Sequence, residues 1–164
     1  METERAKRLA DFVSWVGTNI KGDEKGEAQV FLDRFFQAFG HSGLKEAGAT
    51  LEQRIKKGDG KGTWFADLVW KPVVLIEMKK RGEDLIRHYR QAFDYWTRLV
   101  PGRPRYVALC NFDEFWVYDF DTQMDAPVDR VKVAELATRW GALGFLFPKP
   151  LVPIFGNDQV AVTR

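Results

Sequence analysis

The 164-residue chain is poor in the side chains that most often hold zinc or form covalent cross-links, with one cysteine and two histidines. A lone Cys110 excludes an intrachain disulfide framework and a cysteine-rich zinc site. It falls at the end of the apolar run that starts at Tyr106, which is typical of a small buried residue. His41 and His88 match no ligand spacing, and we interpret both as structural or surface residues.

Long hydrophobic runs are also absent. No uninterrupted apolar stretch approaches the length of a transmembrane helix, and the Met-Glu-Thr-Glu-Arg start lacks a basic-then-apolar signal pattern. The glycine-rich segment 58–62 is not a Walker phosphate loop, because the G-x4-G-K-[ST] pattern is missing. No serine nucleophile elbow is present either. We therefore expect a cytoplasmic protein with no membrane contact, and neither a P-loop enzyme nor a serine hydrolase.

What the chain does contain is enough apolar material for one domain with a substantial core, since 45% of its residues are hydrophobic and 14% aromatic. The net charge is only +2, but it is distributed unevenly. Basic residues outnumber acidic ones between Lys79 and Arg105, and the balance reverses between Asn111 and Glu135. Such an uneven distribution is compatible with a polyanionic partner, although charge runs are usually just solvated faces.

The order of predicted elements indicates an α/β protein. Apolar residues that recur every three to four positions predict helices at 4–20, 24–39, 82–99 and 133–140. Short apolar runs between turn signals predict strands at 51–57, 63–70, 73–79, 106–110 and 114–120. The glycine-rich segment 40–50 is expected to be a loop. We therefore predict a sandwich with a mixed central sheet flanked by helices.

Three charged residues interrupt the apolar hairpin at 63–79. Side chains of a strand alternate between its faces, so Glu77 and Lys79 point the same way, and Asp67 can lie beside them on the neighbouring strand. Two buried carboxylates of like charge need a cation between them, and a hard divalent metal with oxygen ligands fits this requirement. The lysine can then act on a water or on developing negative charge. A partly exposed ladder of ion pairs is the competing interpretation.

Further polar residues accompany this trio. Gln91 and Tyr95 are four residues apart, so they share one face of the helix that follows the hairpin. They can position a phosphate or a water, or they can be a solvated glutamine and an aromatic residue at the edge of the core. Glu27, on the second helix, can supply a further carboxylate, or it can be an ordinary first-turn glutamate favoured by the helix dipole.

Taken together, Asp67, Glu77-x-Lys79 and Gln91-x3-Tyr95 after a helix with Glu27 resemble the PD-(D/E)xK nuclease superfamily, in its branch with a trailing Q-x3-Y motif. Ala66 stands where this family usually has proline. More narrowly, four segments resemble the N-terminal endonuclease domain of bifunctional type IIG/IIL restriction–methylation enzymes: 26–36, 65–70, 91–96 and 104–119. The resemblance covers most of residues 22–147.

The resemblance implies a restriction-endonuclease-like fold and an Mg²⁺-dependent DNA endonuclease, with Mn²⁺ as a substitute. The implied metal ligands are Asp67, Glu77, the backbone carbonyl of Met78 and, as a further candidate, Glu27. Lys79 would act on the water or the phosphate, and Gln91 and Tyr95 would orient the phosphate or Lys79. Candidates for contacts with the DNA backbone are the basic residues Lys56, Lys57, Lys80, Arg81, Arg87 and Arg90.

The resemblance also implies a domain organisation. Residues 1–147 would form the nuclease domain with its N-terminal helices. Residues 148–164 would be a proline-rich tail at the start of a connector to a methyltransferase domain, which is missing here, as is the target-recognition domain. Two alternatives stay open: a catalytically silent DNA-binding or docking module, and a stand-alone repair or junction nuclease of the same fold.

Overall fold

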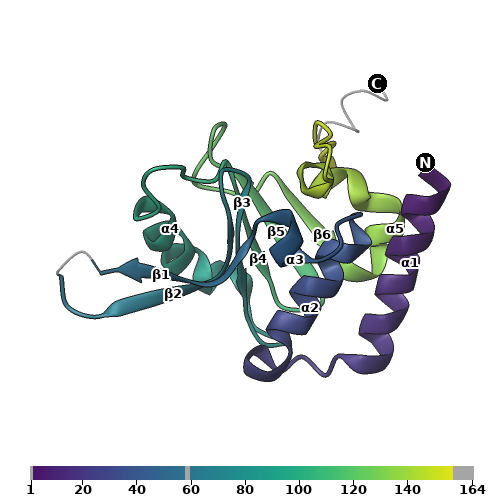
Figure 1. Ribbon diagram of the computed structural model, residues 1–164, viewed down its shortest axis with the longest axis horizontal. Coiled ribbons are helices and arrows are strands. Elements are labelled where there is room, and N and C mark those ends of the chain that lie inside the picture. Colours follow the sequence, from purple (N-terminus) through teal and green to yellow (C-terminus); the bar gives the residue numbers. More distant parts are fainter. Residues whose placement is uncertain (1, 58–59, 157–164) are drawn as a thin grey trace.

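The computed structural model describes residues 2–57 and 60–156 and contains one six-stranded sheet with helices on both faces (Figure 1). The strands are β1 (Thr50–Lys56), β2 (Thr63–Trp70), β3 (Val74–Met78), β4 (Tyr106–Cys110), β5 (Glu114–Asp119) and β6 (Asp129–Lys132). The α-helices are α1 (Glu2–Asn19), α2 (Glu24–Ala38), α3 (Leu44–Ala47), α4 (Tyr89–Thr97) and α5 (Leu136–Arg139). Short 3₁₀ helices are η1 (Leu85–His88), η2 (Val133–Glu135) and η3 (Trp140–Leu146).

The strands follow one another across the sheet in chain order, and only the β3–β4 pair is parallel. A parallel pair needs a crossover connection, which η1 and α4 supply. Every residue of β3 and β4 is buried, as expected for central strands that are covered on both faces. Glu77 is therefore the one charged side chain in a strand that is otherwise apolar.

Two apolar layers sandwich the sheet. On one face, α1, α2 and the η2–α5–η3 region pack against the sheet through aromatic side chains, among them Phe31, Phe35 and Phe115. On the other face, η1 and α4 cover a smaller cluster that includes Leu75 and Leu109. Both layers together form the predicted mixed α/β sandwich, and this prediction is confirmed.

Several element predictions need correction. A sixth strand, β6, was missed because Val131 is its one buried residue and its neighbours are polar. The expected loop at 40–50 contains α3, whose four residues are too few to show helical periodicity. The helix predicted at 82–99 begins as η1 at Leu85 and continues as α4, and the one predicted at 133–140 is a chain of short turns that runs on to Leu146.

The segment after Phe147 packs back onto the domain. The Leu151 and Ile154 amides donate to carbonyls of η3, and Phe155 is buried in the larger apolar layer. Within residues 2–57 and 60–156, no helix is long and apolar enough to cross a membrane. The predicted boundary at residue 147 stays a prediction.

Candidate active site

Strands β2 and β3 separate at the two acidic residues. Their regular pairing ends at Leu68 and Ile76, and the next position along brings Asp67 opposite Glu77. There, the Asp67 amide donates to Oε2 of Glu77 at 2.6 Å, and the Met78 amide donates to Oδ2 of Asp67 at 2.7 Å. Each carboxylate thus accepts a backbone hydrogen bond from the opposite strand, and this crossed pair of bonds holds the two acids beside each other.

The outer neighbour, β1, is irregular at the same place. Glu52 would pair with Asp67, but the register passes over both residues, and Glu52 has a left-handed backbone with φ of +50°. The side-chain alternation resets here: Leu68 packs in the layer of α2, whereas Ala66 packs in the layer of α4. Left-handed backbone is costly for a residue with a side chain and persists only where its surroundings enforce it. Asp67 therefore lies inside β2, at the point where the strand turns over.

Burial and like charge act together on the two acids. Burial raises the pKa of Glu77 well above its usual range, and the charge of Asp67 raises it further. Burial also raises the pKa of Asp67 to about 6, although the Met78 amide and the charge of Lys79 oppose the shift. Two such groups disfavour each other's ionisation, and added positive charge relieves the conflict.

Lys79 is held in place by helix α4. Its Nζ donates to Oε1 of Gln91 at 2.7 Å, and only 13% of its side chain is exposed. Tyr95, one turn further along α4, is buried among apolar side chains. Burial raises the pKa of Tyr95 to about 12, and the charges of Glu77 and Asp67 add to the shift, so that the phenol keeps its proton at neutral pH. The structure thus brings together all five residues expected to be catalytic.

The two glutamates at the start of α2 have different surroundings. Glu27, the expected further ligand, accepts hydrogen bonds from the backbone amides of Lys21, Gly22 and Asp23, and these bonds lower its pKa. It fixes the turn before α2, whose N-cap is Asp23. Glu24, which was not predicted, lies 3.8 Å from Nζ of Lys79, and its charge raises the pKa of Asp67. Sequence spacing cannot separate two carboxylates within the same first turn.

The predicted DNA contacts are spread over three places. Lys56 and Lys57 lie at the end of β1, Arg87 and Arg90 on the exposed side of η1 and α4, and Lys80 in the loop after β3. Arg90 pairs with Asp94 at 3.2 Å. Arg81 is occupied in a different way, since its guanidinium donates to Asp113 and to the carbonyl of Ile20. Its position favours a structural tie between the β3 loop and the end of α1.

The donor set suits a hard cation. Among the described residues, no three histidine, cysteine, aspartate or glutamate side chains are arranged as a ready metal site. Asp67 and Glu77 each have one carboxylate oxygen in the crossed hydrogen bonds and a second, Oδ1 or Oε1, with no protein hydrogen-bond donor in the part of the chain that the structure describes. Mg²⁺ commonly uses one or two carboxylates and fills its remaining positions with water and substrate oxygens. The two carboxylates therefore suit such an ion.

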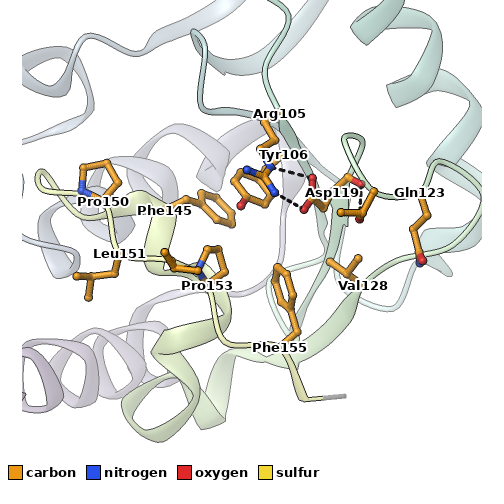
Figure 2. A pocket seen from close by; sticks show the side chains of 12 residues that line it. Arg105, Tyr106, Asp119, Gln123, Val128, Phe145, Pro150, Leu151, Pro153 and Phe155 are labelled. Carbon is orange, nitrogen blue, oxygen red and sulfur yellow. Dashed lines mark hydrogen bonds and ion pairs between the residues drawn. The ribbon is translucent and has the colours of Figure 1, made fainter. Parts of the chain in front are cut away.

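Two cavities lie at opposite ends of the sheet. The smaller, of about 280 Å³, opens beside Asp67. It is lined by α2 and β1 through Glu24, Lys25, Ala28, Gln29, Leu32, Leu51 and Glu52. The larger, of about 670 Å³, lies at the start of β4, where Arg105 and Asp119 form its polar wall (Figure 2). Since Tyr106 in this wall pairs with Val74 at the start of β3, the larger cavity is separate from the candidate site.

Comparisons with known proteins assign the chain to a family. The sequence profile described as "MmeI, N-terminal domain" matches residues 4–164. The chain therefore belongs to the MmeI N-terminal domain family, a type II restriction enzyme family. No curated protein matches the chain in sequence. Among solved structures, the chain is similar to a cryo-EM structure of a DrdV–DNA complex, with 19% identity and a TM-score of 0.47. The match covers 89% of this chain and 13% of that chain.

Proposed function

We propose that the chain is the DNA-cleaving module of a restriction enzyme and that it hydrolyses phosphodiester bonds at a PD-(D/E)xK site with Mg²⁺. The observation that carries the proposal is the adjacent pair of half-buried Asp67 and buried Glu77, whose pKa values stay raised although Lys79 lies nearby. A structural acid pair of this kind would be costly to retain. Membership of a restriction enzyme family supports the same chemistry.

Each residue of the site has a distinct task. Asp67, Glu77 and the Met78 carbonyl would hold the divalent ion. When bound, the ion would supply Lewis-acid charge and lower the pKa of a coordinated water. Lys79, fixed by Gln91, would place a positive charge where negative charge develops on the phosphate. Tyr95 would keep the Gln91 side of the site dry and add a neutral hydroxyl donor.

The test is a plasmid-nicking assay in Mg²⁺ or Mn²⁺ with the unaltered chain, Asp67→Asn and Lys79→Ala. Matched controls are Asp121→Asn and Lys132→Ala, which change an exposed charge of the same sign away from the site. We expect both site variants to lose nicking by at least about a hundredfold, because each removes a charge that acts in the transition state, while the controls retain it. Equal activity in the site variants and the controls would overturn the assignment.

Calorimetric titration with Mn²⁺ tests metal binding separately from DNA cleavage. Binding that Asp67→Asn abolishes supports the metal site even if the chain alone cuts slowly. If the unaltered chain neither nicks DNA nor binds Mn²⁺, the catalytically silent DNA-binding module becomes the better account. We further propose that methyltransferase and target-recognition domains accompany this module in the full enzyme, and that the module alone cuts with little sequence preference.

A further inference from the structure

The outer half of the β1–β2 hairpin has one covered face and one bare face. On the covered face, Ile55 is 3% exposed and the Trp64 ring lies 5.3 Å from the ring of Tyr95 on α4. On the opposite face, Arg54, Lys56 and Phe65 are exposed. In Figure 1 this half of the hairpin extends past α4, away from the rest of the molecule.

Cross-strand pairing gathers the exposed side chains into one surface. Arg54 pairs directly with Phe65, and Lys56 pairs with Thr63. Residues that pair directly in an antiparallel sheet project from the same face. The four side chains therefore form a continuous strip, which we call the hairpin face. Phe65 is 48% exposed there and offers an apolar ring beside the two basic side chains.

The hairpin face leads directly to the candidate site. It lies on the side of the sheet opposite α4, and this is the side of α2 and of the 280 Å³ cavity. Asp67 follows Phe65 by two residues on β2, and both Asp67 and Lys25 of α2 line the cavity. A strand of DNA that lies along the hairpin face would thus enter the cavity between β1 and α2 and reach Asp67.

The positive charge of the hairpin face indicates a partner that carries negative charge. Arg54 and Lys56 have no acidic partner among the residues that the structure describes, so that their charges are available to a phosphate backbone. The acidic member of the region, Glu52, lies next to Asp67, where a divalent ion would offset it. A two-stranded ribbon also has a width that a DNA groove accepts.

We propose that the hairpin face is a docking surface for duplex DNA and that it guides the strand to be cut into the cavity beside Asp67. Arg54 and Lys56 contact phosphates, and the Phe65 ring packs against deoxyribose. This inference rests on the proposed function, which it extends by naming the surface that holds the substrate. The contacts supply affinity and alignment without reading sequence.

The test measures binding without cleavage, by fluorescence anisotropy of a short labelled duplex in the absence of divalent metal. The test variant is Arg54→Gln/Lys56→Gln. The control is Lys45→Gln/Lys132→Gln, which removes the same charge from exposed positions on α3 and β6. We expect the test variant to bind about tenfold more weakly and to lose about 1.8 from the slope of log affinity against log salt. The control should change neither by more than about a fifth of that.

A third variant, Phe65→Ser, addresses the apolar contact. It should weaken binding severalfold and leave the salt slope unchanged, because no charge is removed. Equal losses in the test and control variants would overturn the proposal, as would failure of the unaltered chain to bind the duplex at low salt. Equally strong competition by a single strand would overturn the duplex assignment. Because no metal is present, a loss of binding in the test variant supports the docking surface even if the nicking assay fails.

Discussion

The two ends of the sheet each bury a carboxylate, and their surroundings are opposite. Asp119, at the end of β5, is 3% exposed and accepts two hydrogen bonds from the Arg105 guanidinium, at 3.0 and 2.9 Å. This pairing raises the pKa of Arg105 above its usual range. Glu77, at 2% exposed, faces Asp67 instead, and its own pKa is raised. One acid is paired with an arginine, whereas the other lies beside a second acid.

The difference distinguishes a charge that is neutralised within the fold from the charges of the candidate site. The Arg105–Asp119 pair lines one side of a large cavity, and Asp119 also accepts a hydrogen bond from the Asp121 amide (Figure 2). Both carboxylate oxygens of Asp119 therefore have donors among the described residues. At Asp67 and Glu77, by contrast, burial, like charge and the left-handed Glu52 all act against stability at one place. Sites that store such conflicts are commonly the sites where chemistry takes place.

An Asp→Asn substitution should lower the stability of the protein at one end of the sheet and raise it at the other. The decrease at Asp119 should be larger than the increase at Asp67. Asp119→Asn removes the charge that pairs with Arg105 and leaves a buried amide facing a guanidinium. We expect the free energy of unfolding to fall by about 3 kcal/mol. Urea denaturation at neutral pH measures this. An unchanged midpoint would show that the Arg105–Asp119 pair is not what compensates this end of the sheet.

Asp67→Asn should instead stabilise the protein, by about 2 kcal/mol above pH 7. The folded pKa of Asp67, about 6, lies above its unfolded value, so the folded state holds the proton longer. The contribution of protonated Asp67 to the stability of the folded state is therefore complete below about pH 4, and it is lost as the pH rises through about 6. Thermal unfolding of both proteins from pH 4 to 8 should show curves that diverge as pH rises. Parallel curves would mean that the ionised Asp67 carboxylate does not destabilise the folded protein.

The smallest expected effect distinguishes the two glutamates of α2. Glu27→Ala removes the acceptor for three backbone amides and should cost about 1 kcal/mol of stability. Glu24→Ala should change stability by less than about 0.5 kcal/mol but lower the nicking rate, because Glu24 lies beside Lys79 and Asp67. Chemical denaturation and the nicking assay on both variants check this split. The reverse pattern would restore Glu27 as the residue that acts at the site.

Sequence reasoning predicted the parts of the fold that depend on local periodicity. The continuous apolar runs of β3 and β4 and the stripe of phenylalanines on α2 were sufficient for both central strands and the main helix layer. It missed β6, which exists because it pairs with β5 and not because of its own residues. It also placed α4 as one long helix, although Asp84 caps a 3₁₀ turn first.

For the site, spacing along one strand predicted that Glu77 and Lys79 share a face, and similarity to a known motif added Gln91 and Tyr95. Spacing along the chain cannot predict which of two similar neighbouring residues contacts the site. Glu24 and Glu27 are less than one helical turn apart, and Arg81 carries the same charge as its neighbour Lys80. The contacts of each residue are nevertheless different. The left-handed Glu52 has no glycine to signal it, since the surrounding sheet enforces its conformation.

The crossed hydrogen bonds have one more consequence. In an ordinary ladder, both partners of each bond are peptide groups, which do not titrate. Here the amides of Asp67 and Met78 donate to carboxylates. Part of the hydrogen bonding between β2 and β3 therefore involves acceptors that titrate. The chemical shifts and exchange rates of these two amide protons should follow the protonation of the acids and the arrival of a cation. The backbone thus contains a spectroscopic reporter of the site, readable by NMR without a substrate.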